Sequence, residues 1–122
     1  MKEGYVIRDQ NIPHFITITI VDWIDVFSRK TYRDSVIASF EYCIYNKGMI
    51  LYCYVIMSNH IHMIVQSSDG KLSDLIRDFK KYTAKTILEK IKTEPDLSGS
   101  VSFVAILFQV PLSNSLSRHL QQ

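Results

Sequence analysis

Residues 57–65 read MSNHIHMIV, and the alternation of histidine with apolar residues in this stretch predicts the centre of the fold. Successive side chains of a β-strand point to opposite faces of a sheet. We therefore expect His60 and His62 to share one face, while Ile61 and Met63 point into the core. Two imidazoles that project together from a rigid strand can bind a divalent metal. The pattern alone leaves open a strand that simply carries two solvated histidines.

The sequence on both sides of this stretch predicts two further strands and two helices. The first helix is expected to end at Gly48, and Ser73 is expected to cap the second. The dipeptide Ser58-Asn59 suits a tight turn, so the second and third strands should form a hairpin. In chain order the expected elements are strand 14–21, helix 31–47, strand 49–57, strand 60–66 and helix 73–92.

This order begins a ferredoxin-like βαββαβ sandwich, an α+β fold with an antiparallel sheet and two helices on one face. The first and third strands are then antiparallel neighbours in the middle of the sheet. Thr17 and Thr19 would share the face of the histidines, and Asp22 and Trp23 would approach them. The apolar residues 101–110 could supply the fourth strand.

Composition indicates one globular domain. The chain has 122 residues, of which 47% are hydrophobic and 21% charged, with a formal net charge of +2. This length allows a single core, and the charge does not by itself indicate a nucleic-acid binder. Cys43 and Cys53 are interpreted as buried thiols in a reducing compartment. No stretch resembles a signal peptide or a membrane span, so no membrane partner is expected and the cytoplasm is the expected location.

Residues 54–65, YVIMSNHIHMIV, resemble the metal-binding signature of the HUH single-tyrosine transposases of insertion sequences, and most of all the REP-associated tyrosine transposase group. Members of that group usually read Met-Pro-Asn-His-hydrophobic-His here, and Ser58 replaces the proline. Residues 15–23 (FITITIVDW) resemble the family's first strand, and residues 72–85 (LSDLIRDFKKYTAK) resemble its next helix. The resemblance extends over residues 5–96.

This resemblance implies cleavage and joining of single-stranded or hairpin DNA. In the family, both histidines and a third polar side chain hold Mg²⁺ or Mn²⁺ against the scissile phosphate. A tyrosine hydroxyl then attacks and leaves a covalent 5′-phosphotyrosine. His60 and His62 match the metal ligands, whereas the sequence does not identify the third. Relatives commonly dimerise through their sheets, so a homodimer is expected.

The attacking tyrosine is where this chain departs from the family. The family's nucleophile lies in a carboxy-terminal helix that typically reads Tyr-Ile-His-Asn-Asn-Pro, and no such motif occurs here. Tyr82 is a candidate, but packing at the edge of the core is the favoured interpretation of this residue. Residues 98–122 contain a single charged residue, Arg118. We expect a transposase domain over residues 1–97, truncated before the catalytic tyrosine, and an atypical tail over residues 98–122 with a disordered end.

Basic residues gather on the second predicted helix. Residues 71–94 hold seven lysines and arginines against four acids. Arg77, Lys80, Lys81 and Lys85 are predicted to contact DNA phosphates, although a solvated helix face would show the same pattern. A sheet that displays threonine, histidine and aromatic groups beside such a helix suits single strands or hairpin tips better than duplex DNA.

Three functions therefore remain open. The first is a metal-dependent transposase domain, active or degenerate. The second is a non-catalytic single-stranded nucleic-acid binding module of ferredoxin-like fold. The third is an interaction domain whose open sheet pairs with a second copy. Stabilisation by a divalent metal separates the first from the others, and salt-dependent binding of a hairpin oligonucleotide separates the second from the third.

Overall fold

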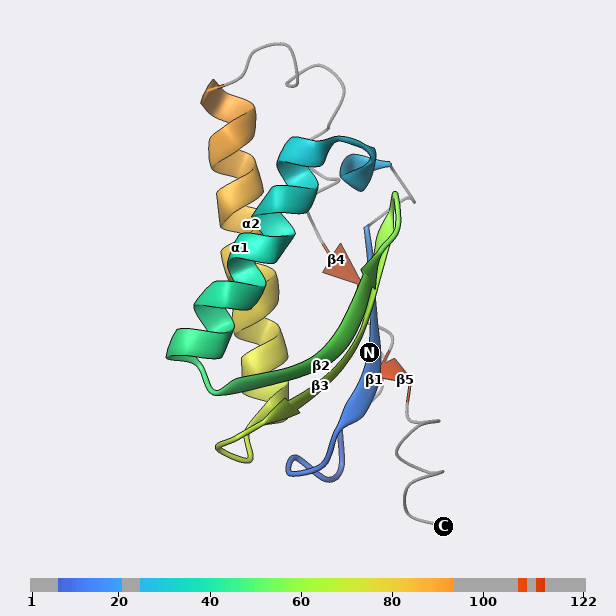
Figure 1. The fold of residues 1–122 in the computed structure, drawn as a ribbon, viewed down its shortest axis with the longest axis vertical. Helices are drawn as coiled ribbons and strands as arrows, with labels where there is room; N and C mark the ends of the chain where they lie inside the picture. The colour runs from blue at the N-terminus through green and yellow to red at the C-terminus, as the bar shows by residue number, and fades with distance from the viewer. Residues whose placement is uncertain (1–6, 21–24, 94–107, 110–111, 114–122) are drawn as a thin grey trace.

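Three long strands form the centre of an antiparallel sheet, and two helices pack against it (Figure 1). The computed structural model describes residues 7–20, 25–93, 108–109 and 112–113. In chain order the elements are β1 (His14–Ile20), the 3₁₀ helix η2 (Val26–Ser28), α1 (Lys30–Asn46), β2 (Met49–Ile56), β3 (His60–Ser67), α2 (Leu72–Thr93), β4 (Phe108–Gln109) and β5 (Leu112–Ser113). Within these ranges no helix is both long and apolar enough to cross a membrane.

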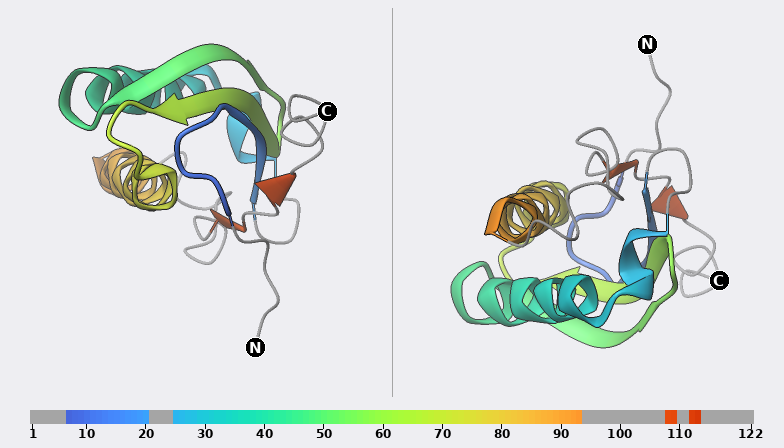
Figure 2. Two further views of the ribbon diagram at one scale, coloured as in Figure 1. Left: turned by 90° about the horizontal axis from the view of Figure 1, so that it is seen from below. Right: turned by 90° about the horizontal axis from the view of Figure 1, so that it is seen from above.

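The strand order is β2-β3-β1-β4, and β5 also pairs with β1. β1 and β3 are antiparallel neighbours, and β2 and β3 form the predicted hairpin. The end views in Figure 2 show α1 and α2 side by side against one face of the sheet. The predicted α+β fold, with an antiparallel sheet and two helices on one face, is confirmed. β4 lies inside the stretch 101–110 that was expected to form the fourth strand, and the rest of that stretch lies outside the described residues.

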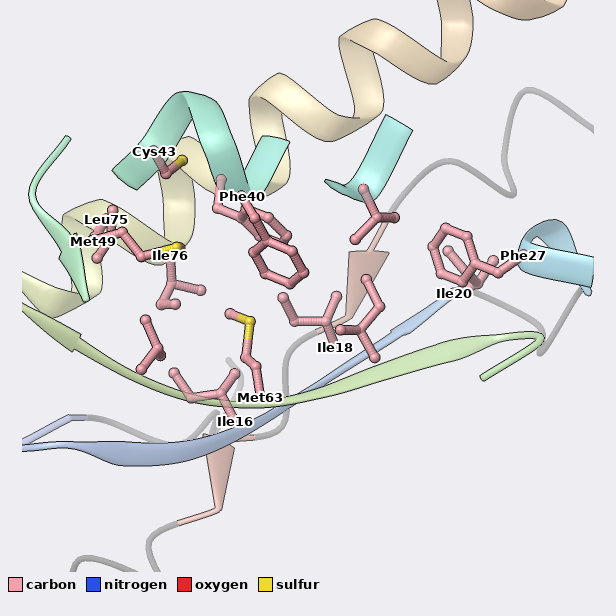
Figure 3. Close-up of a cluster of buried hydrophobic side chains, with 14 of the residues drawn as sticks. Ile16, Ile18, Ile20, Phe27, Phe40, Cys43, Met49, Met63, Leu75 and Ile76 are labelled. Carbon is pink, nitrogen blue, oxygen red and sulfur yellow. The ribbon is translucent and has the colours of Figure 1, made fainter. Parts of the chain in front are cut away.

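The core lies between the sheet and the helices. The side chains of β1 and β3 that are buried there are Ile16, Ile18, Ile20, Ile61, Met63 and Val65. Figure 3 shows Ile16, Ile18 and Met63 directed toward Phe40 of α1. Phe40 in turn stacks on Phe79 of α2, with ring centroids 4.9 Å apart. Burying one side chain of this size contributes about 1.5–3 kcal/mol, so the alternation along β1 and β3 decides which face the helices cover.

Gly48 ends α1, as the sequence predicts. Its φ of +72° lies in the left-handed region that glycine adopts without a steric penalty. A Cβ atom at this position would lie 2.6 Å from the hydroxyl oxygen of Ser68. The backbone N–H of Lys47 donates to the carbonyl of Cys43, which completes the last turn of the helix. The chain then enters β2 at Met49.

The start of α2 differs from the prediction. The helix already begins at Leu72, so Ser73 lies in its first turn and is not the N-cap. The side-chain oxygen of Gln10 accepts the backbone N–H of Ser73 at 2.7 Å, and the Gln10 amide donates to the Ser73 hydroxyl at 2.9 Å. Because Gln10 is 63 residues away in the sequence, the local pattern around Ser73 could not reveal this partner.

Cys53 is exposed, which corrects the prediction that both cysteines are buried, whereas Cys43 is buried as expected. The cause is a β-bulge between Leu51 and Cys53. Leu51 pairs with Val65, which belongs to the core, but Cys53 pairs with Ile64 on the outer face. A shift of one residue in the register moves a side chain to the other side of a sheet.

Candidate metal centre and nucleic-acid surface

His60 and His62 lie side by side on the outer face of β3, away from the helices. The register of the two central strands places Thr19 opposite His60 and Thr17 opposite His62. The centroids of the two imidazole rings are 4.6 Å apart, and the ring planes meet at 78°. Ile61, between the two histidines, is fully buried on the core side. The shared face predicted from the alternation is therefore confirmed.

The turn that precedes His60 is tied to two other segments of the chain. The carbonyl of Ser58 accepts the backbone N–H of Phe27 in η2 at 2.8 Å. The carbonyl of Asn59 accepts the backbone N–H of Ile20, the last residue of β1, at 2.9 Å. The end of β1, the helix η2 and the tip of the hairpin thus meet beside His60 and fix its backbone.

Each histidine ring is held by a hydrogen bond at its Nδ1 atom. The hydroxyl of Thr17 lies 3.0 Å from Nδ1 of His62, and the side-chain oxygen of Asn59 lies 2.8 Å from Nδ1 of His60. The ring of Phe15 also contacts His62, with centroids 5.4 Å apart. Neither Thr17 nor Asn59 was predicted from the sequence to hold a histidine ring. The only signals were the place of Asn59 next to His60 and of Thr17 on the shared face.

The surroundings of His60 favour its neutral form. Burial lowers the pKa of His60 below the ordinary value of 6.5, and the positive charge that His62 can carry lowers it further. A neutral imidazole has a lone pair with which it can bind a metal. His60 can therefore act as a ligand at neutral pH.

Imidazole nitrogens are common ligands of divalent metals, and the distance between the two ring centres is compatible with a shared ion. Two imidazoles that bind one ion at a right angle, with metal–nitrogen distances of about 2.1 Å, have ring centres roughly 4.5 Å apart. The centroids of His60 and His62 are separated by 4.6 Å. In the part of the chain that the structure describes, no third His, Cys, Asp or Glu side chain completes a cluster with them. Asp22 and Trp23, which were predicted to approach the histidines, lie outside the described residues.

A groove of about 690 Å³ lies between α1 and α2, across the sheet from the histidines. Two of the four predicted DNA contacts, Lys81 and Lys85, line it and are exposed. The other charged and aromatic residues of its lining are Tyr42, Lys47, Asp78, Tyr82, Glu89 and Lys92. The lining therefore contains four lysines and two acids, with a pair of tyrosines between the helices.

The other two predicted DNA contacts have different surroundings. Arg77 makes ion pairs with Asp74 at 3.3 Å and with Asp78 at 3.2 Å. Lys80 is half-buried, and burial lowers its pKa below the ordinary value. Acids thus compensate the charge of Arg77, and the protein partly shields Lys80. By contrast, Lys81 and Lys85 are exposed at the groove.

Tyr82, the candidate nucleophile, stacks on Tyr42 of α1. The ring centroids are 4.2 Å apart and the ring planes are within 2° of parallel. Both rings belong to the helix layer, whereas His60 and His62 lie on the outer face of the sheet. The structure therefore does not bring Tyr82 together with the histidine pair.

The family model described as "Transposase IS200 like" matches residues 10–106, most of the chain. The chain belongs to the IS200-like transposase family. No protein with a curated description matches this IS200-like transposase.

Two solved structures are similar to this IS200-like transposase in fold. A candidate transposase from Deinococcus radiodurans R1 has a TM-score of 0.62 at 14% sequence identity, over 99% of this chain and 94% of that one. A REP-associated tyrosine transposase bound to a REP hairpin has a TM-score of 0.56 at 13% identity, over 98% of this chain and 68% of that one. At such low identities the similarity concerns the fold.

Proposed function

We propose that this IS200-like transposase binds Mg²⁺ or Mn²⁺ through His60 and His62 and brings the ion to the backbone of single-stranded or hairpin DNA. The observation that carries this proposal is the pair of imidazoles on one face of a central strand, with centroids 4.6 Å apart. Family membership supports DNA as the substrate, and one structure of similar fold holds a REP hairpin. The proposed location is the cytoplasm, where free thiols persist.

The protein's part in this chemistry is to hold the two rings in place. β3 is paired on both sides, and the backbone before His60 is bonded to β1 and η2, so the ligands are positioned before an ion binds. Thr17 and Asn59 would keep the rings of His62 and His60 in their orientations. When bound, a divalent ion stabilises the charge that develops on a phosphodiester as it is cleaved.

The groove between α1 and α2 is proposed as a second contact for DNA phosphates, separate from the one at the ion, because it lies on the opposite side of the sheet from the histidines. Lys81 and Lys85 are exposed and lie one turn apart on α2. Lys47, which follows α1, lines the same groove and pairs with Asp78 at 3.7 Å. Lysine side chains that neutralise phosphates release counterions from the nucleic acid, which supplies most of the affinity for DNA of any sequence. Arg77 and Lys80 are proposed as weaker contributors, because Arg77 is paired with acids and Lys80 is half-buried.

A homodimer is proposed to form through β2. This strand is at the edge of the sheet, and residues 49–57 contain no charged side chain. The exposed large apolar residues of this segment are Ile50, Tyr52, Tyr54, Val55 and, directly after the strand, Met57. Natural edge strands usually carry lysine, proline or a bulge that prevents pairing with another chain. β2 has the bulge between Leu51 and Cys53 but no lysine or proline, and residues 53–56 after the bulge are regular. Sedimentation velocity should show concentration-dependent dimers, and Val55→Lys should shift them to monomers.

The second candidate function is a non-catalytic nucleic-acid binding module. The position of Tyr82 favours it, because within one chain this tyrosine is stacked in the helix layer and not beside the histidines. Incubation of the protein with a hairpin oligonucleotide and Mn²⁺, followed by a denaturing gel, should then show no covalent protein–DNA adduct. An adduct that disappears in Tyr82→Phe would instead make Tyr82 the nucleophile.

The metal site is tested by thermal unfolding with and without Mn²⁺. A ligand that binds only the folded state raises the unfolding temperature, so the wild-type protein should be stabilised as the Mn²⁺ concentration rises. The double variant His60→Ala/His62→Ala should lose this effect. Ile64→Thr, two residues further along the same face of β3, is the matched control and should keep it. Equal stabilisation of all three proteins would reject the site.

A further inference from the structure

We infer that Asn59 is a positioning residue that selects the tautomer of His60 and thereby determines the nitrogen with which this histidine binds metal. Asp25, the residue before η2, orients Asn59 in turn. The inference rests on the metal site proposed above, but it concerns a state of the protein that exists without metal. It assigns a role to two side chains that are not metal ligands.

The direction of the hydrogen bonds follows from which atoms can donate. The side-chain nitrogen of Asn59 lies 3.5 Å from a carboxylate oxygen of Asp25, a long contact that only an N–H donor can satisfy. The oxygen of the same amide is thus turned toward His60, and it lies 2.8 Å from the Nδ1 atom. Because an amide oxygen only accepts hydrogen bonds, Nδ1 of His60 must carry the proton.

A ring nitrogen that carries a proton has no lone pair for a metal. In the neutral ring of His60, Nε2 is then the ligating atom. The partner of His62 is different, because the hydroxyl of Thr17 can either donate to Nδ1 or accept from it. The two histidines are therefore unequal: the tautomer of His60 is fixed in advance, and that of His62 is free to respond to the ion.

The backbone around Asn59 gives this arrangement its rigidity. The carbonyl of Asn59 is bonded to the N–H of Ile20, and the preceding carbonyl of Ser58 is bonded to the N–H of Phe27. Asp25 lies only two residues before Phe27, so the same contact brings the carboxylate to the hairpin tip. The amide is thus held between β1, η2 and β3. Groups that orient a metal-binding histidine typically change metal affinity by about 10–100-fold when they are removed.

The decisive measurement is the tautomer of His60 in the metal-free protein, read from long-range ¹H–¹⁵N NMR correlations of the histidine rings at pH 7.5. The wild-type protein should show the proton of His60 on Nδ1. Asn59→Leu should shift it toward Nε2, and Asn59→Asp, which keeps an acceptor oxygen in place, should preserve the wild-type state. Thr17→Val, a matched loss of a polar partner at the other ring, should leave the tautomer of His60 unchanged.

A wild-type His60 with its proton on Nε2, or a tautomer that is indifferent to Asn59→Leu, would overturn the inference. If Asn59→Leu does not fold, the Nδ1 proton in wild type and in Asn59→Asp still decides it. Mn²⁺ affinity, measured from the EPR signal of the free ion, gives a second readout. Asn59→Leu should weaken binding by about 10–100-fold and Asn59→Asp should not. Failure of the metal site itself would appear separately, as binding that is unaffected by His60→Ala/His62→Ala.

Discussion

The proposed metal binding should depend on pH through the charge of His60. Burial, and then the charge of His62, lowers the pKa of His60 in the folded protein below 6.5. As the pH falls, His60 therefore becomes protonated in the unfolded chain before it does in the folded protein. The free energy of unfolding then decreases as the pH falls below about 6.5. Protons also compete with the ion for both rings.

We therefore expect the rise in unfolding temperature caused by Mn²⁺ to be present at pH 7.5 and absent at pH 5. Thermal unfolding followed by circular dichroism at both pH values, with and without the ion, measures it. His60→Ala/His62→Ala serves as the control and should show no rise at either pH. An undiminished effect at pH 5 would point to carboxylate ligands instead of imidazoles.

The two cysteines should differ sharply in reactivity. Burial, reinforced by the nearby charge of Asp78, raises the pKa of Cys43 to about 11, so that its thiolate is rare at pH 8. Cys53 is exposed on β2. One thiol should therefore react rapidly with Ellman's reagent in the native protein and two in urea. Cys53→Ser should remove the rapid reaction and Cys43→Ser should keep it; two equally fast native thiols would contradict the burial of Cys43.

At the scale of single residues, the sequence predicts the face of each side chain only where the strand is regular. The alternation correctly places His60 and His62 together because β3 pairs without interruption with β1. The same reasoning fails for Cys53, since the bulge in β2 depends on pairing with another strand. Asn59 is recognisable as a turn residue, but its contact with Asp25 requires the whole fold.

At the scale of elements, α1 and α2 are joined by the stacked pair Tyr42 and Tyr82. A stacked aromatic pair contributes about 0.5–1.5 kcal/mol beyond the burial of the rings. Tyr82→Ala should therefore lower the free energy of unfolding by about 1–2 kcal/mol. Tyr82→Phe, which keeps the ring, should change it by less than about 0.5 kcal/mol.

Urea unfolding of both variants measures this difference. Phe79→Ala in the core is the reference for a larger loss, about 3–5 kcal/mol. If Tyr82→Phe were as destabilising as Tyr82→Ala, the hydroxyl and not the stacked ring would be the stabilising part. Tyr82 would then have a polar role that the parallel rings do not explain.

The elements themselves were more predictable from sequence than the contacts between them. The helix that ends at Gly48 follows from local chemistry, because a glycine with positive φ needs no distant partner. The start of α2 does not follow from local chemistry. Gln10, which is 63 residues away, accepts the backbone N–H of Ser73 in the first turn of the helix. The fourth strand was expected from apolar composition, which cannot specify which residues pair, and β4 covers two of them.

At the scale of the whole molecule, two chemically different surfaces lie on opposite sides of one sheet. The outer face carries the histidine pair, and the helix layer carries the groove lined by Lys81 and Lys85. Alternation along β1 and β3 was sufficient to predict that the histidine face is the one the helices leave open. The basic helix was expected beside that face, but α2 lies on the other side of the sheet because its apolar side packs against the core. The stacking of Tyr42 on Tyr82 was not predictable, because residues so far apart in sequence meet only after the helices pack.

This division predicts that DNA affinity and metal binding can be changed separately. Each lysine that neutralises a phosphate of single-stranded DNA contributes about 0.7 to the slope of log affinity against log salt. Lys81→Gln/Lys85→Gln should therefore reduce that slope by roughly 1.4 for a single-stranded oligonucleotide and weaken its binding at low salt. Fluorescence anisotropy over a range of salt concentrations measures both, in the absence of divalent metal.

Two controls make this result specific to the groove. Lys30→Gln removes a lysine that is 78% exposed and paired with Asp34 at the start of α1, and it should leave the slope unchanged. His60→Ala/His62→Ala should also leave the slope unchanged, because no ion is present and the histidines lie across the sheet. A slope that falls as much in Lys30→Gln would mean that the DNA responds to overall charge. A slope that falls only in the histidine variant would place the DNA on the outer face, with the phosphates against the imidazoles themselves.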